Sequence, residues 1–369
     1  MSDKTGIEWT DATWNPIRGC SRVSDGCRHC YAEAQAARII SMDRGRGIPE
    51  GQGAYDGLLA KGGQWNGQIK VVESAMEQPQ RWRKPRRIFV NSMSDLFHEN
   101  VSEEVIQRIF AVMASAPHHT FQILTKRAEH MREVLSSKDA RWIAEGQLAL
   151  TREGILKPGA YHVTWPLPNV WLGVTVENQA AADERIPQLL KTPAAVRWLS
   201  IEPLLGLVHI ENYLCECPED DDGAPSPGRI DWVVVGGESG PNARPMHPHW
   251  ATSLRDQCLA AGVPFLFKQW GEWRPPVTGE SFSTAMRRAQ RVPAFIVAQD
   301  GTVHCFKNEA TASGGEVLLR VGKHAAGRRL QGELHDAYPT GEAAACRPAA
   351  VGLDMAQQGN WGIREKVLK

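Results

Sequence analysis

The chain has 369 residues, of which 42% are hydrophobic, enough to bury the core of one large domain with additions. Its 42 Lys and Arg residues balance 42 Asp and Glu residues, which excludes an overall field that would draw it to nucleic acid or an anionic membrane. No apolar run approaches the length of a membrane span, and the first residues lack the layout of a signal peptide, so we expect a cytoplasmic protein with no membrane partner.

Short apolar runs recur along the chain, and each ends in a polar or glycine-containing turn. In chain order they cover an early segment around Trp14 to Ile17 and then residues 87–95, 120–127, 169–178, 196–203, 231–240 and 263–271. Most of these runs are near-continuous rather than alternating. That pattern is typical of strands that are buried on both faces of a parallel sheet.

Amphipathic helical patterns lie between several of the runs. One begins near Val101, where Ser102 is placed to cap it, and a later one closes at Gly262. Alternating strands and helices predict right-handed βαβ units. No G-x-G-x-x-G follows the first strand, as a dinucleotide-binding sheet would require. We therefore predict an α/β fold, a partial (β/α) barrel of about six parallel strands.

Three loop insertions interrupt the barrel pattern, near residues 41–68, 136–168 and 214–229. The barrel itself is assigned to residues 1–273. Residues 274–369 are assigned to a small C-terminal appendage, in which Asp300 and Gly301 are predicted to form a hairpin turn. The tail from about residue 341 has little pattern, and we predict that it is disordered.

Polar side chains follow every predicted strand. In parallel α/β folds these positions meet at one rim, where ligands bind, so we expect them to surround a polar ligand. The positions are Asn91, Ser92, Ser94, Asp95, Thr125, Lys126, Arg127, Thr175, Glu177, Asn178, Ser200, Glu202, Gly236, Gly237, Glu238, Ser239, Lys268 and Gln269.

Two basic runs are candidate contacts for nucleic acid. Residues 81–87 hold five basic side chains but precede a predicted strand, so we expect them at the end of the barrel opposite the rim. The second run lies in the appendage and is the better candidate for a contact with a phosphate backbone. It comprises Arg320, Lys323, His324, Arg328 and Arg329.

Three cysteines lie close together near the N-terminus, in the sequence GCSRVSDGCRHC. Cys20, Cys27 and Cys30 have the spacing C-x6-C-x2-C, and a C-x2-C pair can place two sulfurs on one metal centre. Gly19 and Gly26 permit the tight turns that such a loop requires. Because the cysteines follow the first predicted strand, we expect them at the same rim as the polar residues.

The number of thiols leaves two kinds of metal centre open. A structural zinc site is closed by four ligands, so it would need His29 or a distant residue such as Cys217 as the fourth. Three thiolates alone suit a [4Fe–4S] cluster in which one iron remains open to a ligand.

At this point the sequence resembles the radical S-adenosylmethionine (SAM) superfamily, whose partial (β/α)6 barrel carries a three-cysteine loop after its first strand. It is more closely similar to the phage-associated three-cysteine-motif proteins, a family of unknown function. That similarity rests on EWTDATWNPIRGCSRVSDGCRHCYAE, FVNSMSDLFH, FQILTKR, WLGVTVEN, WLSIEPLLG, VVVGGESGPNARP, FKQWGEW and VGKHAAGRRLQGELHDAYP. Three features depart from the superfamily. The first cysteine gap is six residues, His29 stands where an aromatic residue usually precedes the third cysteine, and residues 91–95 replace the Gly-Gly-Glu motif.

The resemblance implies a phage or prophage iron–sulfur enzyme with a [4Fe–4S] cluster on Cys20, Cys27 and Cys30 and with SAM on the open iron. It implies cleavage of SAM to a 5′-deoxyadenosyl radical that takes hydrogen from a substrate, a nucleotide or nucleic acid being the leading expectation. An electron-donor protein is then expected as a partner. No residue is assigned a catalytic role.

On the same resemblance, the strand-end residues divide into two expected groups. The expected cofactor-binding residues are Ser92, Ser94, Asp95, Thr125, Thr175, Glu177, Asn178 and Glu202, and the expected substrate-binding residues are Lys126, Glu238 and Lys268.

Two alternatives remain at the level of sequence. In the first, the cysteines and a fourth ligand hold structural zinc in a non-catalytic protein that binds nucleic acid or acts as an adaptor. In the second, Asp95, Glu202 and Glu238 surround a divalent metal in a hydrolase or nuclease.

Overall fold

A computed structural model describes residues 5–157, 163–215, 228–276, 293–305 and 315–340. The chain divides into a compact unit, Met1–Pro339, and a terminal segment, Thr340–Lys369. The terminal segment lies almost wholly outside the described residues, and so does the predicted disorder from about residue 341. The compact unit is described below.

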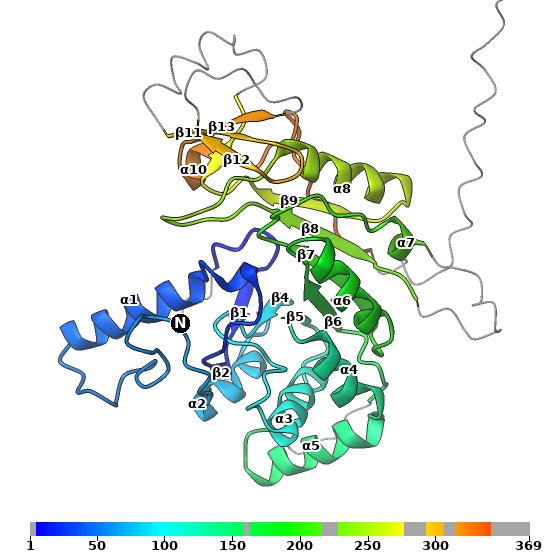
Figure 1. The fold of residues 1–369 in the computed structure, drawn as a ribbon. Coiled ribbons are helices and arrows are strands. Elements are labelled where there is room, and N and C mark those ends of the chain that lie inside the picture. The colour runs from blue at the N-terminus through cyan, green and yellow to red at the C-terminus, as the bar shows by residue number, and fades with distance from the viewer. Residues whose placement is uncertain (1–4, 158–162, 216–227, 277–292, 306–314, 341–369) are drawn as a thin grey trace, which may run out of the picture. The chain divides into compact units, whose positions relative to one another are not determined.

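The centre of this unit is a seven-stranded sheet in which every neighbouring pair is parallel (Figure 1). Its strands follow one another in chain order: β1 (Ala12–Trp14), β4 (Arg87–Val90), β5 (Thr120–Thr125), β6 (Val170–Thr175), β7 (Val196–Ile201), β8 (Trp232–Gly236) and β9 (Phe265–Gln269). The sheet curls into a half-barrel, with β1 and β9 at its two edges. The predicted partial barrel is confirmed, with seven strands instead of about six.

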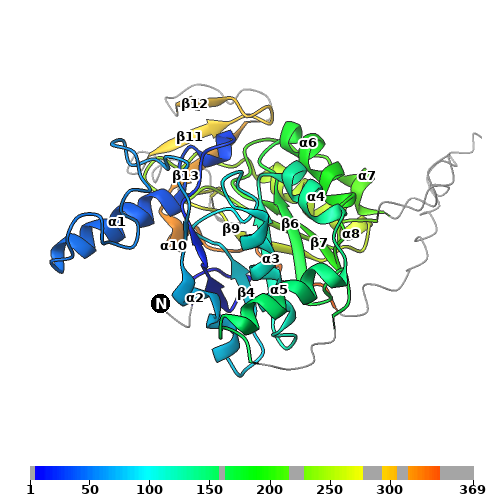
Figure 2. The same ribbon diagram turned by 90° about the horizontal axis from the view of Figure 1, so that it is seen from below.

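Helices occur in the connections between the strands. They are α1 (Tyr31–Gly45), α2 (Glu73–Met76), α3 (Glu103–Ala114), α4 (Ala128–Ser136), α5 (Ala140–Arg152), α6 (Gln179–Leu190), α7 (Glu211–Leu214) and α8 (Pro248–Ala260), with the 3-10 turns η1 (Asp25–Cys27) and η2 (Gln78–Arg81). Figure 2 shows α1 projecting on the β1 side of the sheet, away from α6 and α8. As predicted, Ser102 caps α3, because its side chain accepts a hydrogen bond from the Val105 amide.

The predicted insertions are of different kinds. The segment near 41–68 contains the end of α1 and a series of turns. Residues 136–168 contain α5, a helix that packs on α3. Residues 216–227, most of the third predicted insertion, lie outside the described residues.

A second, smaller sheet follows the half-barrel. It contains β10 (Trp273–Arg274), β11 (Ala294–Val297), β12 (Val303–Cys305) and β13 (Glu316–Arg320), in the antiparallel order β10-β13-β11-β12, and α10 (Lys323–Ala326) follows it. The predicted hairpin turn is confirmed between β11 and β12. Gly301 has a φ of 91°, and Asp300 accepts a hydrogen bond from the Thr302 amide.

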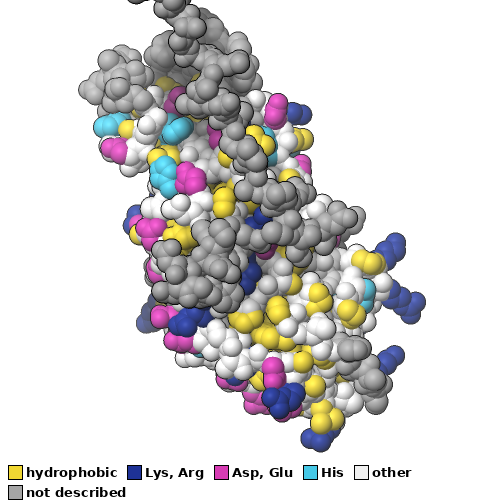
Figure 3. All heavy atoms as spheres, turned by 90° about the vertical axis from the view of Figure 1, so that its right-hand side faces the viewer, with side chains coloured by type: hydrophobic (Ala, Val, Ile, Leu, Met, Phe, Trp, Pro, Cys, Tyr) yellow, Lys and Arg dark blue, Asp and Glu magenta, His cyan; other side chains and the backbone are white. Residues whose placement is uncertain are grey.

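The surface in Figure 3 carries Lys, Arg, Asp and Glu side chains scattered among apolar and other residues. That mixture agrees with the zero formal net charge. Among the described helices, none is both long enough and apolar enough to cross a membrane.

Alternation along the strands separates two apolar cores. Ile88 and Val90 of β4 belong to the larger core, which also contains apolar side chains of the helices. Phe89, between them, belongs to an aromatic cluster on the concave side of the sheet. Trp9, Trp198 and Trp232 fill the same space, with ring centroids 5.1 Å apart for Trp9 and Trp198 and 5.4 Å for Trp198 and Trp232. Indole rings therefore fill this part of the interior of the half-barrel.

Glycine at one strand position makes room for this cluster. A Cβ atom added to Gly173 of β6 would lie 2.5 Å from the indole of Trp198 on the neighbouring strand. Trp198 cannot move away easily, because it is fully buried and its Nε1 donates to the Ile123 carbonyl.

Gly173→Ala is expected to lower the free energy of unfolding by about 1–3 kcal/mol, because the added methyl group overpacks the indole cluster. Urea denaturation measures this change. Gly45→Ala is the matched control, since a Cβ at Gly45 meets no atom within 4 Å. Equal stability of the two variants would contradict the proposed role of Gly173.

Candidate functional site

The carboxyl ends of the parallel strands surround a cavity of about 390 Å³. Trp9, Phe89 and Leu124 give it an apolar wall. Most of the polar residues that were expected at the rim line it as well: Asn91, Ser92, Ser94, Asp95, Thr125, Lys126, Arg127, Thr175, Ser200, Glu202, Gly237, Glu238, Ser239, Lys268 and Gln269. The structure therefore gathers these predicted residues at one place.

The same alternation that builds the indole cluster also builds the polar walls. Along β7 and just past its end, positions two residues apart carry Trp198, Ser200 and then Glu202, and the last two line the cavity. On β9, Leu266 of the aromatic cluster is followed two residues later by Lys268. Side chains at this spacing share one face of a strand, so the concave side changes from apolar to polar toward the carboxyl ends.

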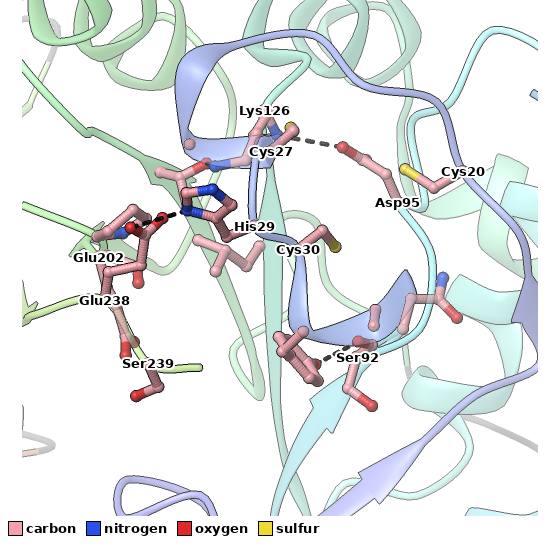
Figure 4. A pocket seen from close by; sticks show the side chains of 18 of the residues that line it. Cys20, Cys27, His29, Cys30, Ser92, Asp95, Lys126, Glu202, Glu238 and Ser239 are labelled. Atoms are coloured by element: carbon pink, nitrogen blue, oxygen red, sulfur yellow. Dashed lines mark hydrogen bonds and ion pairs between the residues drawn. The ribbon is translucent and has the colours of Figure 1, made fainter. Parts of the chain in front are cut away.

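Cys20, Cys27 and Cys30 all line this cavity (Figure 4). Cys20 follows β2 (Ile17–Arg18), which pairs with β3 (Lys70–Val71), while Cys27 ends η1 and Cys30 precedes α1. Burial raises the pKa of the Cys20 thiol to about 12, with a further contribution from Asp95, and burial also raises the pKa of Cys30. Ligation of a metal at these thiols therefore has to displace protons.

The cysteine loop bends at two glycines, for different reasons. Gly19 has a φ of 94°, and a Cβ there would lie 2.1 Å from the Gln68 carbonyl oxygen. Gly26 instead allows close approach to the barrel, because a Cβ there would lie 2.5 Å from the Glu177 side chain. Ser24 adds a hydrogen bond of 3.1 Å from its hydroxyl to Glu177 Oε1.

Arg127 ties the first cysteine to the turn that follows β4. Its Nη2 donates to Ser21 Oγ at 2.7 Å, and its Nη1 donates to Asp95 Oδ2 at 3.0 Å and lies 4.0 Å from Cys20 Sγ. Its Nε donates to Glu99 at 2.8 Å. The sequence placed Arg127 at the rim but did not identify this contact with the cysteine loop.

The carboxylate of Asp95 is occupied by the protein's own donors. Oδ1 accepts from the Phe97 amide and from Thr125 Oγ1, and Oδ2 accepts from the Lys126 amide and from Arg127. A carboxylate offers about four acceptor positions. Asp95 and Thr125 therefore hold the strand ends in place, and they have little capacity left for the cofactor contact expected from sequence.

Glu177 is 1% exposed and lies behind the cavity wall. It is paired with Lys126, which also donates to Thr175 Oγ1 at 2.9 Å, and with Arg185 of α6 at 3.0 Å. Burial acts to raise the pKa of Glu177, but the two cations outweigh burial and leave the pKa below its ordinary value. The sequence analysis did not identify Arg185. Its position could have been noticed, because it places a charged residue on the buried face of the amphipathic helix α6.

Asn178 does not line the cavity. Its side chain accepts a hydrogen bond of 3.0 Å from the Ala181 amide and so caps α6. The structure therefore places Asn178 at the start of α6 and not among the residues that line the cavity.

Two further ion pairs involve residues that line the cavity and follow β7 and β8. They are Lys268 with Glu202 and Arg244 with Glu238. Lys268 Nζ lies 2.7 Å from Glu202 Oε2, and Gln269 donates to Glu202 Oε1 at 3.0 Å. Glu238 is paired with Arg244 at 2.6 Å and with His29 Nδ1 at 3.2 Å. Burial acts to raise the pKa of Glu238, but Arg244 and His29 outweigh it and lower the pKa.

Arg244 was not identified from sequence. Both lysines expected to bind an anionic substrate, Lys126 and Lys268, are already paired with carboxylates of the chain.

Among the described residues, no three His, Cys, Asp or Glu side chains converge so as to hold one metal ion. A zinc site needs four donors at one point; His29 is engaged with Glu238, and Cys217 lies outside the described part of the chain. Asp95, Glu202 and Glu238 each have a cationic partner and do not form a group for a divalent metal.

A [4Fe–4S] cluster makes a different demand, because its three thiolates surround one cluster but each binds a different iron. Cys20, Cys27 and Cys30 line one cavity, so the number and type of donors at this place agree with that demand.

Comparison with known proteins gives a family but no activity. Residues 4–339 match a protein-family model described as "Protein of unknown function (DUF5131)". Because the match covers most of the chain, this protein belongs to that family. No curated protein and no solved structure matches the chain.

Glu177→Gln is expected to lower the free energy of unfolding at neutral pH by about 3 kcal/mol, because it leaves Lys126 and Arg185 without their charge partner. The lowered pKa of Glu177 means that its contribution is present above the ordinary carboxyl pKa and is lost as the pH falls. The difference from wild type should therefore shrink on acidification, as measured by urea unfolding at several pH values.

Glu104→Gln serves as the control, since Glu104 is exposed on α3. A stability difference for Glu177→Gln that does not change with pH would contradict the assignment of the charge pair.

Proposed function

We propose that this protein is an iron–sulfur enzyme of the radical SAM type, acting in the reducing cytoplasm on a nucleotide or nucleic acid. The observation that carries the proposal is that Cys20, Cys27 and Cys30 line one cavity at the carboxyl ends of a parallel half-barrel. Ligands of parallel α/β folds bind at this end of the sheet.

In this proposal Cys20, Cys27 and Cys30 would hold a [4Fe–4S] cluster reduced by a separate donor protein. One electron from it would cleave SAM to methionine and a 5′-deoxyadenosyl radical, which would take a hydrogen atom from the substrate and become 5′-deoxyadenosine. The residues of the chain bind and orient the two ligands and limit the access of water.

The turn after β4 is suited to an ammonium group such as that of SAM. Ser92 Oγ donates to Asn15 Oδ1 at 3.1 Å, and Ser94 Oγ donates to the Ile17 carbonyl at 3.0 Å. These bonds use the hydroxyl protons and leave oxygen lone pairs free to accept hydrogen bonds. The turn also contacts the cysteine segment, because Tyr31 Oη donates to the Ser92 carbonyl.

The wall formed by Lys268, Glu202 and Glu238 is left for the substrate. Its paired charges present both donors and acceptors without a large excess of either sign. Such a surface orients a polar substrate by hydrogen bonds more than by net charge.

Anaerobic reconstitution with iron and sulfide is expected to give a brown protein with about four irons per chain. Changing Cys20, Cys27 or Cys30 to Ser should remove most of this iron, because each thiolate binds a separate iron of the cluster. Iron analysis and visible absorption measure the result. Cys215→Ser is the matched control, because Cys215 is exposed.

Chemical reduction of the reconstituted protein with SAM should then yield 5′-deoxyadenosine, detected by mass spectrometry. A fully loaded protein that forms none would overturn the enzyme assignment. A colourless protein with one zinc per chain would favour the zinc-stabilised nucleic-acid-binding or adaptor protein instead.

A further inference from the structure

The hydroxyl group of Ser21 has two hydrogen-bond partners that belong to the barrel. Ser21 follows Cys20 directly, is half-buried and lines the cavity. Its Oγ lies 2.7 Å from Arg127 Nη2 and 2.9 Å from His98 Nε2. A guanidinium group can only donate, so the contact with Arg127 uses one lone pair of the hydroxyl oxygen. The role of the second contact depends on which ring nitrogen of His98 carries a proton.

The backbone assigns the tautomer of His98. The Asn100 amide donates to His98 Nδ1 at 3.1 Å, so Nδ1 is an acceptor and carries no proton. His98 is 2% exposed, and burial together with the charge of Arg127 lowers its pKa. Glu99 opposes this shift from 3.5 Å, but its side chain is 62% exposed to water. The neutral ring therefore carries its proton on Nε2, which donates to Ser21 Oγ.

Ser21 is consequently restricted to donating. A hydroxyl group has two lone pairs and one proton, and both lone pairs are used by His98 and Arg127. Incoming donors occupy two of the three staggered positions around the oxygen, which leaves the third for the hydroxyl proton. No hydrogen bond among the described residues gives this proton an acceptor. Ser92 and Ser94 are the opposite case, because their protons are used within the chain.

The hydroxyl of Ser21 and the sulfur of Cys20 lie around the same guanidinium group. Arg127 Nη1 is 4.0 Å from Cys20 Sγ, while Nη2 donates to Ser21 Oγ. A neutral thiol is a weak acceptor, whereas a thiolate bound to iron, or a sulfide of a cluster, carries negative charge and accepts more strongly. The cluster of the proposed function would therefore supply the acceptor that the Ser21 proton lacks.

We propose that Ser21 is a positioning residue of the cluster site, whose hydroxyl donates a hydrogen bond to a sulfur of the cluster at Cys20. The inference rests on the proposed function and adds to it a residue that binds no iron. Hydrogen bonds to sulfur are among the factors that set the reduction potential of an iron–sulfur cluster. Reduction adds a negative charge, so this donor stabilises the reduced form and raises the potential. His98 and Arg127 orient the donor in advance.

The reduction potential of the reconstituted protein tests this role. Ser21→Ala keeps the three cysteines but removes the donor. We expect it to lower the equilibrium constant for one-electron reduction about tenfold, which makes the potential about 59 mV more negative. A redox titration followed by electron paramagnetic resonance measures the shift. Ser41→Ala is the matched control, because Ser41 is exposed on α1, and its potential should equal that of wild type.

A pair of variants with the same shape separates the hydrogen bond from packing. Ser21→Thr keeps the hydroxyl group and should retain a potential close to that of wild type. Ser21→Val replaces that hydroxyl by a methyl group and should shift the potential as Ser21→Ala does. Thermal unfolding of each iron-free variant records the cost to folding. A merely structural role for Ser21 predicts lower stability and an unchanged potential in the clusters that form.

The wild-type protein provides a second measurement that needs no variant to assemble a cluster. Electron–nuclear double resonance of the reduced cluster, compared in H2O and D2O, should detect an exchangeable proton coupled to the cluster. Ser21→Thr should keep this signal, and Ser21→Ala and Ser21→Val should lose it. If neither of the latter variants assembles a cluster, absence of the exchangeable proton in wild type would overturn the inference.

Iron analysis distinguishes failure of the inference from failure of the proposed function. A wild-type protein that assembles no cluster would overturn the proposed function, and the role of Ser21 with it. A cluster that assembles with an unchanged potential in both Ser21→Ala and Ser21→Val would overturn the role of Ser21 alone.

Discussion

The buried carboxylate of Glu177 is the point on which the arrangement of the site depends. It accepts a hydrogen bond from Ser24 of the cysteine loop and packs closely against Gly26 of the same loop. It is also paired with Lys126, which follows β5, and with Arg185 of α6. A carboxylate that is 1% exposed is stable only when it is paired and hydrogen-bonded. The same contacts that compensate its burial therefore also hold the cysteine loop against the half-barrel.

A second connection runs through Asp95 and Arg127 to Ser21, next to the first cysteine. The loop is thus attached on both sides, near Cys20 and near Cys27. Neither connection uses a thiol as its main partner. The three sulfurs are positioned by polar contacts of their neighbours and face a cavity whose remaining walls come from the sheet.

The charges around the cavity occur largely as pairs. Lys126, Lys268 and Arg127 each have a carboxylate partner, which limits their attraction for a polyanion. Combined with the apolar wall of Trp9, Phe89 and Leu124, this balance suits a small polar ligand better than a polyanion. It also explains how a chain of zero net charge can carry a strongly polar site.

By itself, the sequence determined the strands, their parallel order and the rim at which their polar ends meet, because hydrophobic runs and strand alternation are local signals. It also identified the three cysteines as one group, since they lie within eleven residues. Only the tertiary structure decided which of the polar rim residues already use their hydrogen-bonding groups within the chain. Asn178 caps a helix, and Asp95 accepts from Phe97 in its own turn and from residues 125–127 after β5. The partners Arg185 and Arg244 come from positions outside the strand ends. Pairing between buried charges depends on distances between segments that are remote in the chain, and no local pattern encodes those distances.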